Sequence, residues 1–452
     1  MNIIVVGCGK IGTTILQSLV EEGHNVTAVD KRPSALTDIT NIYDVMTVCG
    51  NGGDWETLEV AGVGSADLVV ATTGSDEVNM LCCHMAKCSG AKKTVARVRN
   101  PEYNDRSLQT MRQYLDLSAS INPDKLAAME LYAMLRLPAA AKVDTFAARR
   151  FEMIEIKLKE DSPLAGMPLV EARNRFKAKF LIAVVQRGDQ VFIPDGNFVL
   201  QGGDKVGVSA TYGEMQKLIK ALGLAKKQAR EVMLLGGSRT AYYLAKRLLS
   251  AGVSVKIIDK DREVCETLCE LLPGATIICG DGTQQEVLLE EGLEKMDAFV
   301  SLTGMDEQNI LLSCFASIHN VSKVITKVSR PELAGLAQNL GVECIVSPRS
   351  IVADLLMQYA RALENSMGSS VDTLYRLMDD GAEALVFNVK DDPRLVRIPL
   401  KDLALKPQVL MAGIMRGREI IIPTGADTIL PGDKVVVITT GRRLNDLSDI
   451  LK

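Results

Sequence analysis

The sequence has few residues of the kinds on which catalytic, metal-binding and nucleic-acid-binding proteins depend. Three histidines occur in 452 residues, and none of the ten cysteines forms a CxxC pair. The 52 Lys and Arg residues are outnumbered by 56 Asp and Glu residues, so no basic excess is available to neutralise nucleic-acid phosphates. No nucleic-acid partner is expected. No metal site is expected either, because His84 and Cys88, four residues apart, supply two ligands where three or four are needed.

Long apolar runs are also missing. No stretch approaches the ~18 uncharged apolar residues that a membrane-spanning helix needs, and the chain enters a strand pattern directly after Met1, unlike a signal peptide. We therefore expect a soluble cytoplasmic protein whose cysteines are small apolar core residues in a reducing environment. If the protein acts at a membrane, it must dock peripherally on another protein, without inserting.

An internal repeat is the strongest feature that the sequence does contain. The recurring blocks, in chain order, are Gly7 with Gly236, residues 73–79 with 303–309, Pro123 with Pro348, and residues 203–206 with 432–435. The offset is 236 − 7 = 229 for the first block, and it stays within one residue of this value except at the prolines. Matching blocks in one order indicate a tandem duplication.

Each half of the repeat divides into two domains. The first part alternates short apolar runs with helical periodicity, which is typical of a parallel sheet covered by helices on both faces. The second part alternates apolar and charged residues between glycine-containing turns, which predicts a small α+β domain. We expect an α/β protein with two tandem Rossmann-type doubly wound parallel sheets, each followed by a small α+β domain. The expected domains span residues 1–140, 141–225, 230–366 and 370–452.

The first Rossmann-type domain carries a complete dinucleotide-binding fingerprint. The GxGxxG loop consists of Gly7, Cys8, Gly9, Lys10, Ile11 and Gly12. Its first glycine permits a tight turn, the second lets a phosphate approach the backbone, and the third lets the following helix pack closely. Amide groups at the helix N-terminus then face the phosphates. Asp30 closes the next strand, where its carboxylate can accept hydrogen bonds from both ribose hydroxyls, which favours NAD or a simple adenine nucleotide over NADP.

The second Rossmann-type domain departs from this pattern. Its loop consists of Gly236, Gly237, Ser238, Arg239, Thr240 and Ala241, and Asp259 retains the ribose acid. Serine in place of the middle glycine adds a side chain where the phosphate would approach, whereas alanine is tolerated at the last position. The domain is expected to fold, and nucleotide binding at its site stays open.

Further candidate residues lie at the carboxyl ends of two strands in each sheet, where ligands bind in such folds. They are Thr73, Gly74 and Arg97 in the first copy, and Thr303, Gly304 and Lys327 in the second. The cations are suited to phosphates. The alternative interpretation of Arg97 is a surface ion pair.

A helix predicted over 124–136, and its repeat over 350–361, have more apolar positions than one helix face requires. Leu126, Leu131 and Leu135 point in more than one direction around the first of them. Such a helix packs either on its own domain or on something outside its own sheet. The two helices are candidates for exchange between units, and the chain is not expected to stay monomeric.

These residues together resemble the TrkA family, the peripheral regulatory subunits of bacterial Trk potassium uptake systems. Besides the GxGxxG loop and Asp30, the resemblance rests on residues 71–80, 96–101 and 161–166, and it covers the whole chain. Members carry two RCK (or KTN) nucleotide-binding domains. The resemblance implies that the loop glycines, Asp30, the Thr73–Gly74 segment and Arg97 line a site for NAD(H), or for ATP or ADP. It also implies a homotetrameric ring that gates a Trk-type potassium-translocating membrane subunit.

An NAD-dependent dehydrogenase is the alternative from a different class. It would need a substrate domain and a proton-transfer residue beside the nicotinamide. The two small domains contain no histidine, so we expect a regulatory protein rather than an enzyme.

Overall fold

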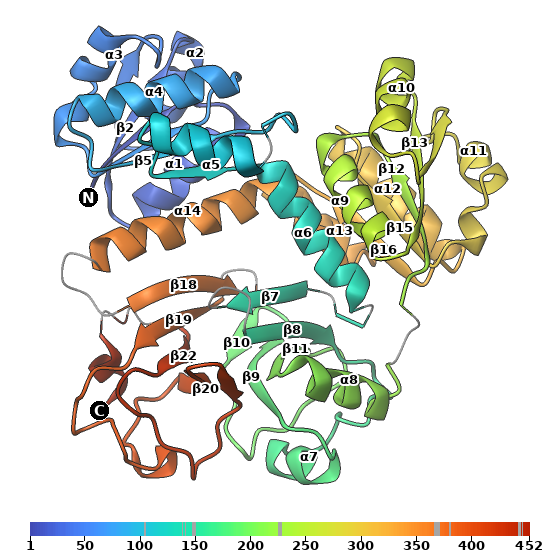
Figure 1. Ribbon diagram of the computed structural model, residues 1–452. Helices are drawn as coiled ribbons and strands as arrows, with labels where there is room; N and C mark the ends of the chain where they lie inside the picture. The colour runs from blue at the N-terminus through green and yellow to red at the C-terminus, as the bar shows by residue number, and fades with distance from the viewer. Residues whose placement is uncertain are drawn as a thin grey trace.

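The computed structural model contains two parallel sheets of six strands and two antiparallel sheets of five strands (Figure 1). It describes residues 1–103, 105–137, 139–140, 142–146, 151–224, 228–365, 371–378, 381–441, 444 and 446–452. The expected fold class is confirmed. The expected domain limits at 141, 225, 366 and 370 lie outside the described residues.

The first parallel sheet has the strand order β3-β2-β1-β4-β5-β6. Its strands are β1 (Asn2–Val6), β2 (Asn25–Asp30), β3 (Met46–Cys49), β4 (Leu68–Ala71), β5 (Lys93–Arg97) and β6 (Ala119–Ile121). The helices between and after them are α1 (Lys10–Glu21), α2 (Pro33–Thr40), α3 (Trp55–Val60), α4 (Asp76–Cys88), α5 (Asp105–Tyr114) and α6 (Pro123–Arg136). The chain crosses over between β3 and β4, so the carboxyl ends of β1 and β4 lie beside the reversal of strand order, where such sheets bind ligands.

The second parallel sheet repeats this order as β14-β13-β12-β15-β16-β17. Its strands are β12 (Glu231–Leu235), β13 (Ser254–Asp259), β14 (Thr276–Cys279), β15 (Ala298–Ser301), β16 (Lys323–Lys327) and β17 (Cys344–Val346). The helices are α9 (Arg239–Ser250), α10 (Arg262–Leu271), α11 (Gln285–Glu290), α12 (Asp306–Ile318), α13 (Pro331–Asn339) and α14 (Pro348–Asn365). We call these two sheets with their helices the first and second Rossmann units.

The two antiparallel sheets belong to the small domains, and their inner faces pack together. The first consists of β7 (Lys142–Phe146), β8 (Phe151–Lys157), β9 (Phe180–Arg187), β10 (Gln190–Phe192) and β11 (Lys205–Ala210), with helices α7 (Leu169–Arg175) and α8 (Tyr212–Ala221). The second consists of β18 (Val371–Leu377), β19 (Ala382–Asn388), β20 (Val409–Arg416), β21 (Glu419–Ile421) and β22 (Lys434–Thr439). Met153 and Val184 of the first share one buried cluster with Ala384 and Val436 of the second.

The helices α6 and α14 are exchanged between the two Rossmann units of one chain (Figure 1). Leu131 and Met134 of α6, both fully buried, pack against Leu244 of α9 in the second unit. Conversely, Leu356 of α14 packs against Leu16 of α1 in the first unit. The expectation that these helices contact something outside their own sheet is therefore confirmed. The expected exchange between units is confirmed as well, and the units are the two Rossmann units of one chain.

Local sequence explains where α6 starts. Asn122 has an extended backbone, and its side chain accepts a hydrogen bond from the amide of Lys125, while Pro123 occupies the first helical position. Asparagine before proline is a strong helix start because the side-chain oxygen satisfies a free amide and the proline ring presets the backbone. In the described part of the chain, no helix is both long enough and apolar enough to cross a membrane.

Candidate functional site

The three glycines of the first loop have different surroundings. Gly7 has a φ of +93°, and a Cβ added there would lie 2.6 Å from the Thr73 amide nitrogen. A Cβ at Gly12 would lie 1.9 Å from the Gly7 carbonyl oxygen. A Cβ at Gly9, in contrast, meets nothing within 4 Å among the described residues. Gly7 and Gly12 are thus required by the fold itself, whereas the space beside Gly9 is open to a ligand.

The N-terminus of α1 is open in the same place. Gly9 is its N-cap residue, and within the described residues no side chain caps the helix and no acidic residue lies in its first turn. The first amides of a helix have no partner inside the helix, and the helix dipole favours an anion there. This end of α1 therefore has the features of a phosphate-binding site.

Asp30 lies at the end of β2 beside this loop, with 7% of its surface exposed. Its carboxylate accepts hydrogen bonds from the Cys8 amide at 2.8 Å and the Arg32 amide at 2.9 Å. Burial raises the pKa of Asp30, but the hydrogen bonds from Arg32 and Cys8 outweigh burial and hold the pKa below its ordinary value. The carboxylate is therefore ionised at neutral pH and ready to accept hydrogen bonds from ribose hydroxyls. Asp259 accepts from the Gly237 amide in the second unit.

In both units a buried asparagine holds the segment that follows the fourth strand, which is Thr73–Gly74 in the first unit and Thr303–Gly304 in the second. Asn79 is fully buried; its carbonyl oxygen accepts from the Thr73 amide at 2.7 Å, and its amide group donates to the Arg97 carbonyl at 2.9 Å. Asn309 makes the same pair of bonds to Thr303 and Lys327. Sequence reasoning missed the role of this residue, although asparagine stands at the same place in both copies of a recurring block.

The two cations expected to reach phosphates are turned into the structure. Arg97 donates to the Thr73 carbonyl, and its Nε is buried without a partner in the described residues. The surface ion pair is therefore not what the structure shows. The amine of Lys327 donates to the Leu302 carbonyl at 3.1 Å. Burial lowers the pKa of both side chains; cationic neighbours from the opposite loop, Arg239 for Arg97 and Lys10 for Lys327, also lower it. The two loops thus lie within electrostatic range of each other's strand ends.

The second loop is closed by its own side chain. Ser238 is the N-cap residue of α9, and its hydroxyl accepts a hydrogen bond from the Ala241 amide at 3.3 Å. This amide lies in the first turn, and at the corresponding helix start of the first unit no described side chain caps the helix. The two loops therefore differ in more than the added Cβ that the sequence indicates.

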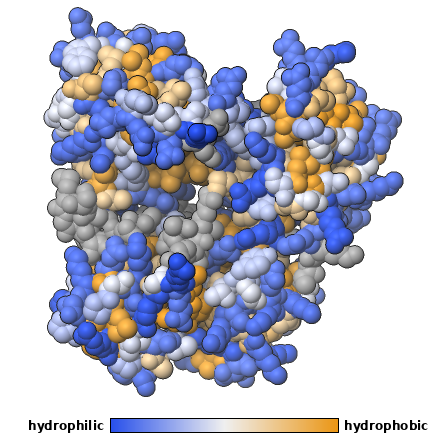
Figure 2. All heavy atoms as spheres, viewed as in Figure 1, coloured by the Kyte–Doolittle hydropathy of each residue, from blue (hydrophilic) through white to orange (hydrophobic). Residues whose placement is uncertain are grey.

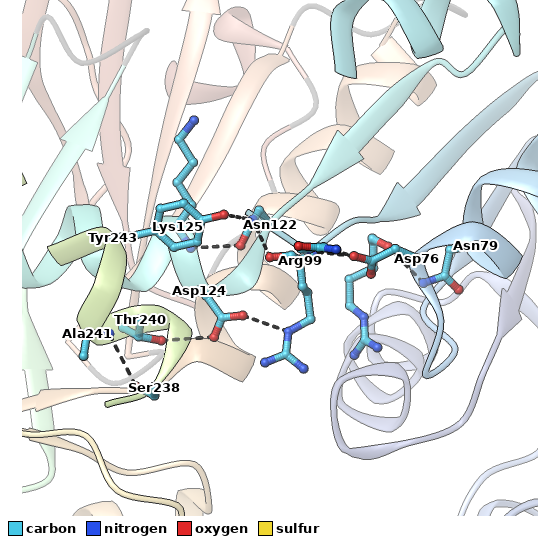
Figure 3. A network of polar contacts seen from close by, with 12 residues as sticks. Asp76, Asn79, Arg99, Asn122, Asp124, Lys125, Ser238, Thr240, Ala241 and Tyr243 are labelled. Atoms are coloured by element: carbon cyan, nitrogen blue, oxygen red, sulfur yellow. Dashed lines mark hydrogen bonds and ion pairs between the residues drawn. The ribbon is translucent and has the colours of Figure 1, made fainter. Parts of the chain in front are cut away.

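A polar network joins the two units at this place (Figure 3). Asp76 accepts from the Arg99 amide at 2.8 Å, and the Arg99 side chain forms an ion pair with Asp124 of α6 at 2.8 Å. The other carboxylate oxygen of Asp124 accepts from the Thr240 hydroxyl of α9 at 3.1 Å. Asn122 donates to the Tyr243 hydroxyl at 3.1 Å. A path of polar contacts thus leads from Asp76, at the start of α4, to Thr240 of the second loop.

A cavity of about 1070 Å³ lies elsewhere, between α1, α6, α13, α14 and the small domains. Its lining includes Gln17, Glu130 and Gln358 but no residue of either GxGxxG-type loop. We place the candidate site at the loops, because there the amides, the acid and the strand ends converge.

The described residues contain no group of three or more His, Cys, Asp or Glu side chains that could hold a metal ion. The interpretation of the cysteines as core residues is correct for some and wrong for others, because Cys49, Cys88, Cys269 and Cys279 are exposed.

Comparison with known proteins identifies the repeat units. The TrkA-N domain model matches residues 3–115 and 232–348, and the TrkA-C domain model matches residues 153–223 and 385–452. A "Trk system potassium uptake protein TrkA homolog" from Archaeoglobus fulgidus is 32% identical over 452 residues, covering 100% of both chains. The "Trk system potassium uptake protein TrkA" of Vibrio alginolyticus is 28% identical over 446 residues, covering 98% of this chain and 96% of the relative.

Solved structures share the fold over nearly the whole chain. The GsuK RCK domain is similar with a TM-score of 0.64 and 18% identity, covering 97% of this chain and 92% of that one. The GsuK channel bound to NAD gives a TM-score of 0.63 and 17% identity, covering 97% of this chain and 77% of that one. With both domain models matched twice, and with a relative at 32% identity over its full length, the chain belongs to the TrkA family.

Proposed function

We propose that this protein is a cytoplasmic regulatory subunit that binds a nucleotide in its first Rossmann unit and thereby gates a Trk-type potassium-translocating membrane subunit. The nucleotides proposed are NAD(H), ATP and ADP. The observation that carries the proposal is the open N-terminus of α1 beside Gly9, with the ionised carboxylate of Asp30 one strand away. The helix end is suited to the phosphates of an adenine nucleotide, and the Asp30 carboxylate is suited to its ribose. Such a crevice recognises both parts.

The names of the relatives and of the solved structures support the same function. Curated relatives are named as Trk potassium uptake proteins. Structures of GsuK, which share the fold, are described as bound to NAD and to ADP. In the proposed site, the loop from Gly7 to Gly12 holds the phosphates, and Arg97 fixes the Thr73–Gly74 segment against them. The equivalent residues of the second unit form a site that differs in its loop.

We also propose a homotetramer, a ring of four chains that docks on the membrane subunit at the inner face of the cell membrane. Leu81 of α4 and Leu311 of α12 occupy corresponding positions of the repeat, with 48% and 66% of their surfaces exposed. Exposed apolar residues that recur at the same place in both units are suited to contacts between copies. Light scattering tests this assembly: a tetramer is expected, and Leu311→Arg is expected to give smaller species. A monomer at micromolar concentration, with or without nucleotide, would rule out the ring.

Binding is tested by calorimetric titration of the full chain with NADH, ADP and ATP. Saturable binding is expected, and Gly9→Val is expected to abolish it at the first loop because the new side chain fills the space where the phosphate enters. Gating is tested by potassium flux in liposomes that contain a Trk membrane subunit. Flux should change when the protein is added, and it should change again when nucleotide is added. A ligand can shift the equilibrium between two conformations of the ring only if it binds them with different affinities. A potassium flux that stays unchanged after both additions would refute the gating role.

The dehydrogenase alternative needs a proton-transfer residue beside the bound cofactor. Near the first loop, the Asp30 carboxylate accepts from the Cys8 amide, the Thr72 hydroxyl donates to the Gly7 carbonyl, and the Thr73 hydroxyl donates to Asn79. We therefore propose binding without turnover. Steady oxidation of NADH with a small carbonyl substrate, lost in Gly9→Val, would support the enzyme instead.

A further inference from the structure

The exchanged helix α6 brings a carboxylate to the second loop. Asp124 is in the first turn of α6, in the first half of the chain, yet its Oδ1 accepts from the Thr240 hydroxyl in the first turn of α9 at 3.1 Å. Only 8% of Asp124 is exposed, and Thr240 is buried as well. An anionic side chain of this protein is thus held against the helix end that, in a Rossmann fold, receives the ligand's phosphate (Figure 3).

The other end of this contact holds the carboxylate in place. Oδ2 of Asp124 accepts from Arg99 at 2.8 Å, and the Arg99 amide is bound in turn by Asp76. The carboxylate therefore has a cation on one side and the first turn of α9 on the other. A carboxylate near a helix N-terminus interacts favourably with the helix dipole. The same carboxylate repels a phosphate, and within a poorly solvated interface that repulsion is weakly screened.

The repeat places the opposite charge at the corresponding position of the other exchanged helix. Pro348 corresponds to Pro123, so Arg349 corresponds to Asp124. Arg349 stands in the first turn of α14, the helix that packs on α1 of the first unit. One exchanged helix thus starts with a cation and the other with an anion. Ile11 in the first unit also stands where the second unit has Thr240, so the first loop offers no hydroxyl for such a contact.

We infer that Asp124 determines the specificity of the second crevice by excluding phosphorylated ligands from its loop, so that one chain binds one nucleotide. The inference rests on the proposed function. Ser238 acts in the same direction, because its hydroxyl already occupies the Ala241 amide. The two units then have separate tasks. The first responds to nucleotide, and the second is held by the chain's own carboxylate.

In the test, ADP is titrated into full-length variants that all carry Gly9→Val, which removes nucleotide binding at the first loop. Gly9→Val alone is expected to show no saturation at millimolar ADP. Adding Asp124→Asn should increase the affinity at the second loop at least about tenfold, and adding Ser238→Gly as well should give saturable binding of one ADP per chain. Asp38→Asn is the matched control, since Asp38 is exposed on α2 and its replacement removes the same charge far from the loop.

Two results would overturn the inference: one ADP already bound by the Gly9→Val protein, or no ADP bound by the triple variant while its thermal unfolding is cooperative. Asp124→Ala removes the carboxylate in a second way if Asp124→Asn fails to fold. Failure of the proposed function is recognised separately, as wild-type protein that binds neither ADP nor NADH. In either case the inference is tested by comparing the ADP affinity of the Gly9→Val protein with that of the Gly9→Val protein that also carries Asp124→Asn.

Discussion

Arg361 of α14 forms an ion pair with Glu22, which directly follows α1, although 339 residues separate them in the chain. Two guanidinium nitrogens reach the carboxylate, and the side chains are only 14% and 10% exposed. The pair fastens the end of the exchanged helix to the first Rossmann unit, next to the apolar contacts of Leu356.

Arg361→Ala is expected to destabilise the protein by about 3 kcal/mol, because it leaves a mostly buried carboxylate without its partner. Chemical unfolding measures the change. The matched control is Arg262→Ala, which removes an exposed ion pair with Glu266 one helical turn away, and exposed pairs of this kind contribute little. Equal effects of the two substitutions would show that the Arg361–Glu22 pair does not hold the helix.

Leu131→Ala is expected to cost about 2–5 kcal/mol, the range for removing a fully buried leucine side chain from a close-packed core. Since its partners are in the same chain, the decrease in the thermal midpoint relative to the wild type should be the same at every protein concentration. Leu271→Ala, at an exposed position of α10, serves as the control and should leave the stability nearly unchanged. A midpoint of Leu131→Ala that recovers when the protein is concentrated would instead place α6 between chains.

Gly9→Val and Gly12→Val are expected to separate binding from folding. The side chain at position 9 enters open space, so the thermal midpoint should stay close to that of the wild type while nucleotide binding is lost. At position 12 the Cβ would meet the Gly7 carbonyl, so the helix must move away from the sheet and the protein should unfold at a clearly lower temperature. Circular dichroism and calorimetry measure the two effects. A Gly9→Val protein that binds as the wild type does would show that the phosphate does not approach this residue.

Stability should fall between pH 7.5 and pH 5.5 because of His24. This side chain is 5% exposed, lies 3.4 Å from Glu364, and has Met1, Glu22 and Arg361 as charged neighbours. Burial is the main cause that lowers the pKa of His24 below 6.5, against the opposing pull of Glu364. Below pH 6.5 the unfolded chain therefore binds a proton that the folded chain binds less readily, so stability decreases as the pH falls.

His24→Gln should make this decrease smaller, measured as the difference in unfolding free energy between the two pH values. An unchanged pH dependence in His24→Gln would mean that other groups cause it.

Much of the fold could be predicted because its signals are local. The apolar run Ile3–Val6 and the glycine loop after it predict a strand, a turn and a helix in that order. The repeat provides a second copy of each of these signals. Strand β6 (Ala119–Ile121) gives no comparable signal, because it has three residues and only Ile121 is buried.

The candidate site could be predicted less completely, because its geometry depends on contacts between distant segments. The excess of apolar positions on α6 predicts that a second partner exists but cannot name it, and the partner proved to be α9 of the same chain. Asn79 and Asp124 looked like ordinary polar residues of a helix start. Their roles arise only when the fold brings β5 to Asn79 and α9 to Asp124.

The reciprocal exchange of α6 and α14 also determines when the chain can finish folding during its synthesis. The apolar surface of α1 around Leu16 is covered by Leu356, which the ribosome adds 340 residues later. At a synthesis rate of about 5–20 residues per second, this surface stays uncovered for on the order of tens of seconds. Neither half of the gene product is a finished folding unit by itself. A nascent chain released early, or a fragment cut between the halves, exposes one apolar helix and lacks another, so the two halves must be parts of a single polypeptide to fold completely.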